Sequence, residues 1–160
     1  MEISAPLVFP AHAALAVREV VPAAEVGDLF PRAYALLGEV LGRAQSEPAA
    51  VRGYYFSPPS DTLDAAAAFV IDPAARARIE ELLPEYADRG VEILEFAETR
   101  AIKTELTGGY EQLGGAWGEF CTLIARAGYE AGEWTCEDYL TMPGEVPVDE
   151  IRTDLYSAIK

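Results

Sequence analysis

The segment "WTCEDYLTMP", residues 134–143, has the composition of a β-strand but carries two acids in its middle, Glu137 and Asp138. Successive side chains of a strand point to opposite faces, so one of these carboxylates is expected to point inward. Glu137 would then share a face with Tyr139, and Asp138 would share the other with Cys136. The pattern leaves two alternatives open: Asp138 is the inward acid, or both acids flank a bulge.

The rest of the chain repeats one order of elements, strand, helix, strand, strand, in two halves. Alternating and 3.6-residue apolar patterns predict these elements. In the first half we expect a strand over 12–21, a helix from Leu29 capped by Asp28, and a strand hairpin over 49–59 and 61–72. A short helix over 76–87, stopped by Gly90, connects the halves. In the second half we expect strands over 91–96 and 99–107, a helix with apolar face Tyr110, Leu113, Trp117, Phe120, Cys121 and Ile124, then strands over 134–143 and 150–159 separated by a turn over 143–147.

The two halves also end their third elements alike, with "YYFSPP" at 54–59 and "DYLTMP" at 138–143. Each half alone is too small to bury much apolar surface. The order predicts an α+β fold of duplicated strand-helix-strand-strand (SHS2-type) units, with two long helices on one antiparallel sheet. We expect a single domain over 1–160, with half 1 at about 11–72, a connector at 73–90 and half 2 at about 91–160.

The charge of the chain restricts its partners. Its 160 residues include 12 basic and 27 acidic ones, giving a net charge of −15. Such a field repels nucleic acid and anionic membrane surfaces and favours cationic small molecules, although acidity also serves solubility alone. The sequence has no apolar run of about 20 residues and no secretory signal pattern, so we expect a cytoplasmic protein.

Metal and cofactor chemistry has few candidate residues. Two cysteines and one histidine form no CxxC or HxxxH spacing, so we expect neither metal nor cofactor. The tract "TGGYEQLGGAWG", residues 107–118, stands where a phosphate-binding loop would, but its spacing fits no such motif. Glycines inside the following helix instead indicate close approach of the sheet or of a bound molecule.

Aromatic residues from both halves are the candidate ligand-binding set, together with Glu137. They are Tyr54, Phe69, Tyr110, Trp117, Phe120 and Tyr139. Tyrosine and tryptophan have polar ends that need partners when buried, so several of them together indicate a cleft wall, with plain core filling as the alternative. A carboxylate among rings is costly unless hydroxyl groups hold it or a cation completes it. A cation over such rings gains further stabilisation.

The runs "TGGYEQLGGAWGEF", "AGYEAGE", "CEDYLTMP" and "EIRTDLYSAI" resemble the second half of the GyrI-like small-molecule-binding domain, the effector-binding domain of AraC- and MerR-type multidrug regulators. The segment "GYYFSPPSDTLDAAAAFVI", with Asp64, resembles its first half more loosely. This chain has Gly-Gly-Tyr where that family often has Gly-Pro-Tyr. Only ten residues precede the likeness, so we expect no helix-turn-helix DNA-binding domain.

The resemblance implies two helices flanking a central groove that takes lipophilic, often cationic, aromatic compounds, with a buried glutamate as counter-ion. Carried over by motif, Glu137 and Tyr139 match the Glu-x-Tyr pair, Tyr110 matches the tyrosine that heads the helix, and Trp117 matches the mid-helix aromatic. This resemblance favours Glu137 as the inward acid.

We therefore expect a small-molecule-binding protein for bulky lipophilic, cationic aromatic compounds. The alternative is a hydrolase of reactive, cyclopropane-bearing compounds, an activity implied by one branch of the family, with Glu137 and Tyr139 as catalytic residues. A protein-binding module is a third possibility. The sequence leaves open the ligand and whether it is turned over.

Overall fold

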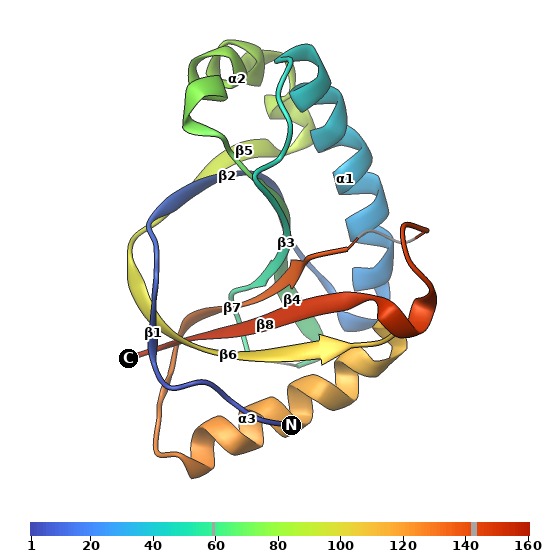
Figure 1. Cartoon of the computed structure of the whole chain (residues 1–160). Coiled ribbons are helices and arrows are strands. Elements are labelled where there is room, and N and C mark those ends of the chain that lie inside the picture. The colour runs from blue at the N-terminus through green and yellow to red at the C-terminus, as the bar shows by residue number, and fades with distance from the viewer. Residues whose placement is uncertain (59, 142–143) are drawn as a thin grey trace. The chain divides into compact units, whose positions relative to one another are not determined.

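The computed structural model describes residues 1–58, 60–141 and 144–160 (Figure 1). The chain forms two compact units, one of Ala11–Ala97 and one of Met1–Pro10 with Glu98–Lys160. Each contains a four-stranded antiparallel sheet and a long helix, which confirms the α+β class. The expected strand end at Pro59 and the expected turn start at Pro143 lie outside the described residues. No helix among the described residues is long and apolar enough to cross a membrane.

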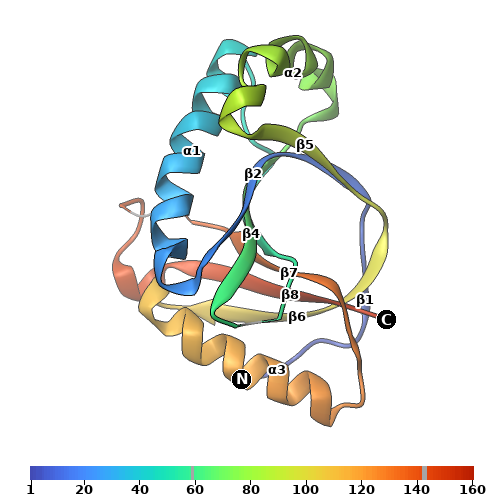
Figure 2. The ribbon, with the colours of Figure 1, turned by 180° about the vertical axis from the view of Figure 1, so that it is seen from behind.

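The Ala11–Ala97 unit is built around one long helix. Its elements are β2 (His12–Pro22), α1 (Val26–Arg43), β3 (Ala50–Tyr55), β4 (Thr62–Val70), α2 (Arg76–Leu82) and β5 (Val91–Phe96). The strand order is β3-β4-β2-β5, with every pair antiparallel. Helix α1 lies along β2 and β4 (Figure 2) and buries Leu37 and Val40 against Leu15, Val17 and the small side chains of β4.

Helix α1 begins earlier than the sequence predicts. A 3-10 turn over Ala23–Glu25 follows β2 and runs directly into the helix at Val26, so the expected cap by Asp28 is wrong. Asp28 instead lies in the first turn, where its charge complements the helix dipole. Pro31 lies in the second turn, and the helix continues through it although the ring nitrogen cannot donate to Gly27.

The connecting helix is shorter than expected. Helix α2 ends at Leu82, because Pro84 cannot donate in a continuing α-helix, and 3-10 turns follow. Gly90 ends this segment in the left-handed region at φ 80°, as predicted. Strand β5 then pairs with β2, so it belongs to the same compact unit as the first half.

The second unit repeats this plan. Its elements are β1 (Leu7–Phe9), β6 (Thr99–Thr107), α3 (Leu113–Arg126), β7 (Ala131–Tyr139) and β8 (Arg152–Ile159). The order β1-β6-β8-β7 and the order β5-β2-β4-β3 follow one rule: an edge strand, then the first, third and second strands of the repeat. This shared order confirms the duplication.

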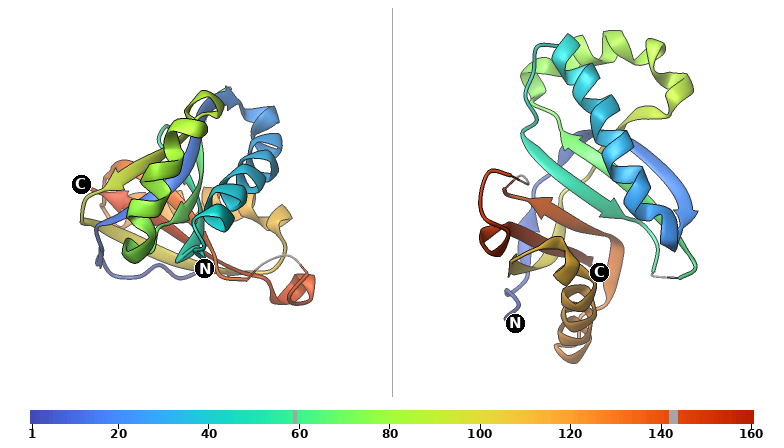
Figure 3. Two further views of the ribbon diagram at one scale, coloured as in Figure 1. Left: turned by 90° about the horizontal axis from the view of Figure 1, so that it is seen from above. Right: turned by 90° about the vertical axis from the view of Figure 1, so that its right-hand side faces the viewer.

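Helix α3 covers the β6–β8 side of its sheet (Figure 3) through Ala116, Phe120 and Ile124, which pack on Ile102 and Leu155. These helix positions are spaced by four residues and form one stripe. Cys121 lies off that stripe and is exposed, so its predicted place on the apolar face is wrong.

Two of the features in this unit were not predicted. Strand β1 has only three residues, too few to show alternation. Strands β7 and β8 pair Ala131 with Ile159 but then Thr135 with Ser157, so β7 carries two extra residues relative to a regular ladder. Gly132 lies in this bulge, where a Cβ atom would come within 2.9 Å of the carbonyl carbon of Ala158.

We expect Leu37→Ala to lower the free energy of unfolding by about 2–5 kcal/mol, because Leu37 of α1 is fully buried against the sheet and the cavity cannot collapse completely. Val20→Ala is the matched control, since Val20 is 69% exposed and its truncation should change stability by about 0.5 kcal/mol or less. Urea unfolding followed by circular dichroism measures both. Equal losses for the two variants would contradict this description of the core.

Candidate functional site

The carboxylate of Glu137 is held by two aromatic donors. Glu137 lies on β7 and is only 4% exposed. Its Oε2 accepts a hydrogen bond from Trp117 Nε1 at 2.7 Å, and its Oε1 accepts one from the Tyr139 hydroxyl at 2.6 Å. These lengths are typical of hydrogen bonds to an ionised acceptor. One buried carboxylate is thus clamped between an indole and a phenol.

Two periodicities produce this arrangement. Glu137 and Tyr139 are two residues apart on β7, so they share a sheet face, and Glu137 pairs in register with Leu155, which packs under α3. Trp117 lies one turn before Phe120 on α3, with the two rings 5.7 Å apart. Packing of the Phe120 stripe therefore brings the indole N–H to the carboxylate.

Asp138 points to the opposite face of β7, where it pairs in register with Asp154. Both aspartates are buried, so both faces of β7 are shielded from water at this position. Asp154 forms an ion pair with Lys103, whose Nζ lies 3.2 Å from Asp154 Oδ2. Burial lowers the pKa of Lys103, but the hydrogen bond to Asp154 raises it, and the net direction is upward.

Tyr110 extends the aromatic surroundings of Glu137. Its ring meets that of Tyr139 edge to face, with centroids 5.7 Å apart. The pKa of Tyr110 is raised, mainly because burial disfavours the phenolate and also because the negative charge of Glu137 repels it. The titration of Tyr110 therefore senses the charge of Glu137.

Tyr54 and Phe69 belong to the Ala11–Ala97 unit and lie on opposite faces of its sheet. Tyr54 is fully buried, stacks on Phe96 at 4.4 Å, and its hydroxyl lies 2.7 Å from His12 Nε2 and 3.1 Å from Arg52 Nη1. Arg52 can only donate, so the Tyr54 oxygen accepts from it, and the tautomer of His12 sets the direction of the Tyr54–His12 hydrogen bond. Phe69 stacks on Tyr34 of α1 at 5.4 Å.

The structure thus brings Glu137, Tyr139, Trp117, Tyr110 and Phe120 together in one unit. The sequence did not predict the group formed by His12, Arg52 and Tyr54. Alternation within "VRGYY" places Arg52 and Tyr54 on one face and was the available signal.

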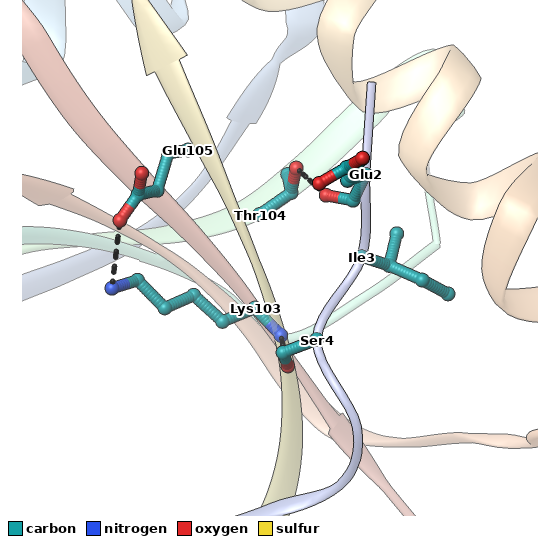
Figure 4. A pocket seen from close by; sticks show the side chains of 6 residues that line it. All are labelled: Glu2, Ile3, Ser4, Lys103, Thr104 and Glu105. Atoms are coloured by element: carbon teal, nitrogen blue, oxygen red, sulfur yellow. Dashed lines mark hydrogen bonds and ion pairs between the residues drawn. The ribbon is translucent and has the colours of Figure 1, made fainter.

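A hollow of about 510 Å³ lies elsewhere, between residues 2–4 and β6 (Figure 4). Its polar groups tie the two segments together: Lys103 N donates to Ser4 Oγ at 2.9 Å and Thr104 Oγ1 donates to the Glu2 carbonyl at 2.7 Å. None of the expected ligand-binding residues lines it. Across residues 1–58, 60–141 and 144–160, no group of three His, Cys, Asp or Glu residues is placed to hold a metal ion.

No family model and no curated protein matches this sequence. Solved structures do match its fold. A chain of the EcmrR–DNA complex superposes with a TM-score of 0.73 at 14% identity, covering 99% of this chain and 57% of that one. SAV2435 bound to tetraphenylphosphonium superposes with a TM-score of 0.72 at 12% identity, covering 100% and 94%. This chain has the GyrI-like fold.

A hydrolase from Listeria innocua shares the GyrI-like fold, with a TM-score of 0.61 at 12% identity over 97% of this chain and 91% of that one. The present chain spans little more than half of the EcmrR chain that it matches. Proteins with the GyrI-like fold thus include one solved with a lipophilic cation and one described as a hydrolase.

We expect Glu137→Gln to lower the pKa of Tyr110, because removal of a nearby negative charge makes the phenolate less costly. The pKa should stay above the ordinary tyrosine value, since burial is the larger cause of the shift. Ultraviolet difference titration of Glu137→Gln, with and without Tyr110→Phe, isolates this phenol. Glu133→Gln, an exposed change on the same strand, should leave the titration unaltered. An unchanged or raised Tyr110 pKa in Glu137→Gln would contradict the coupling.

Proposed function

We propose that this protein binds bulky lipophilic aromatic cations in the cytoplasm, with Glu137 as the counter-ion. One observation carries the proposal: the Glu137 carboxylate is almost fully buried and is held by Trp117 and Tyr139. Neither donor is positively charged. A carboxylate fixed in this way presents negative charge at an aromatic surface.

The physical chemistry of such a site favours large, weakly hydrated cations. A small, strongly hydrated ion loses its water shell on entering an apolar site, whereas a cation that is shielded by aryl groups loses little hydration. The faces of aromatic rings add an attraction of about 0.5–2 kcal/mol to a cation above them. The net charge of −15 raises the local concentration of cations around the protein.

Tyr110 and Phe120 extend the rings around Glu137 in this proposal. Tyr54 and Phe69 of the candidate set lie in the Ala11–Ala97 unit. The tetraphenylphosphonium bound by SAV2435, which has the same fold, supports this choice of ligand class.

A second candidate function is hydrolysis of an electrophilic, cyclopropane-bearing compound. The 2.6 Å hydrogen bond between Tyr139 and Glu137 favours it, because it couples a carboxylate base to a phenol that can deliver a proton. The GyrI-like hydrolase from Listeria innocua supports the same idea. Mass spectrometry separates the two functions: catalytic formation of a water adduct indicates the hydrolase, and recovery of unchanged compound at stoichiometric occupancy indicates the binding protein.

We expect Glu137→Gln to weaken tetraphenylphosphonium binding by about tenfold or more, because it removes a buried charge opposite the cation. Triphenylphosphine oxide, a neutral compound of similar shape, should lose about twofold or less. Isothermal titration calorimetry measures both ligands.

Glu133→Gln is the matched control, since Glu133 is an exposed acid on the same strand, and it should change neither affinity. Equal losses for the cation and the neutral oxide in Glu137→Gln would rule out the counter-ion role.

A further inference from the structure

Thr153 of β8 carries a buried hydroxyl group. Its side chain is 1% exposed, and its Oγ1 has no hydrogen-bond partner in the part of the chain that the structure describes. Thr104 on the neighbouring strand is equally buried, but its Oγ1 donates to the Glu2 carbonyl at 2.7 Å. Buried hydroxyls in folded proteins nearly always have a partner. The Thr153 hydroxyl is therefore an exception that requires a cause.

The position of Thr153 places this hydroxyl beside the Glu137 site. Thr153 pairs in register with Tyr139, whose hydroxyl donates to Glu137. Strand alternation puts Thr153 on the same sheet face as Tyr139 and Glu137. Glu137 is its diagonal neighbour across the strand pair, a relation that separates Cα positions by roughly 7–8 Å and lets side chains converge on one group.

The two polar groups differ in what they offer a ligand. The carboxylate of Glu137 carries the negative charge and only accepts hydrogen bonds. The Thr153 hydroxyl also accepts. One cation with two N–H groups can donate a hydrogen bond to each residue. A fully substituted cation can balance the charge of Glu137 but cannot donate a hydrogen bond to Thr153.

We propose that Thr153 is a specificity-determining residue of the Glu137 site and selects primary or secondary ammonium groups on an aromatic body over cations that lack N–H. One N–H donates to Glu137 and the second donates to Thr153 Oγ1. This inference rests on the proposed cation-binding function and names its ligand class more narrowly.

The test uses a matched pair of ligands, a diphenylmethyl N-methylammonium and its N,N,N-trimethylammonium analogue, titrated by calorimetry. Wild type should prefer the secondary ammonium by about tenfold or more, because its two N–H groups make hydrogen bonds to Glu137 and Thr153 that the trimethylammonium cannot make. Thr153→Val should reduce this preference by about three- to tenfold, the worth of one hydrogen bond, by weakening the secondary ammonium alone, and Thr153→Ser should retain it. Thr104→Val, which loses an engaged hydroxyl, should keep the preference.

Stability of the ligand-free protein gives an independent readout. Thr153→Val replaces an unused hydroxyl with a methyl group, so its urea midpoint should equal or exceed that of wild type. Thr104→Val breaks a hydrogen bond and should unfold at lower urea. A Thr153→Val midpoint well below that of wild type would mean that the hydroxyl has a structural partner and would overturn the proposal.

Failure of this inference is distinguishable from failure of the proposed function. If both ligands bind through Glu137 but Thr153→Val weakens them equally or not at all, the Thr153 role is wrong and cation binding stands. If neither ligand binds, or Glu137→Gln leaves both affinities unchanged, the cation-binding function itself fails and the Thr153 role fails with it.

Discussion

Burial of the Glu137 carboxylate is the constraint on which the second unit depends. An ion withdrawn from water is costly unless hydrogen bonds replace its hydration. Trp117 and Tyr139 supply two of those bonds, at 2.7 and 2.6 Å. The indole reaches the carboxylate only while α3 sits on its sheet through Phe120 and Ile124. The geometry of the site in this unit therefore depends on the packing of its core.

The two units share a topology but not a chemistry. Each has an edge strand followed by the first, third and second strands of the repeat, with one long helix on the sheet. In the second unit a tyrosine hydroxyl donates to a carboxylate, whereas in the Ala11–Ala97 unit the Tyr54 hydroxyl is hydrogen-bonded to the His12 imidazole and accepts from Arg52. Duplication has preserved the backbone plan, and the polar residues on it have diverged.

Much of this architecture is readable from the sequence, because long amphipathic helices and alternating strands carry strong periodic signals. The repeat of strand, helix, strand, strand and the pairing of Glu137 with Tyr139 on one face follow from such patterns alone. The start of helix α1 was harder to predict, because the 3-10 turn over Ala23–Glu25 has no distinctive composition. The buried face of α3 was also predicted too broadly, because Cys121 is apolar in character but lies off the buried stripe.

Features that depend on pairing between strands could not be read from the sequence. The extra residues of β7 leave no mark in the local pattern, since a shift of two positions preserves the alternation of faces. The sequence likewise does not show that the Thr153 hydroxyl lacks a partner among the described residues. "IRTDLYSAI" shows that hydroxyl residues alternate with apolar ones, but not which of the hydroxyls finds a partner.

The bulge at Gly132 shifts the pairing of β7 with β8 by two residues. Continuing the pairing of Ala131 with Ile159 in regular steps would set Glu137 directly across from Thr153, where acid and hydroxyl could bond to each other and close off both groups. The inserted pair of residues moves the acid along to Leu155 instead. Because any side chain at position 132 would collide with the backbone of Ala158, a glycine here permits the register that separates the acid from the alcohol.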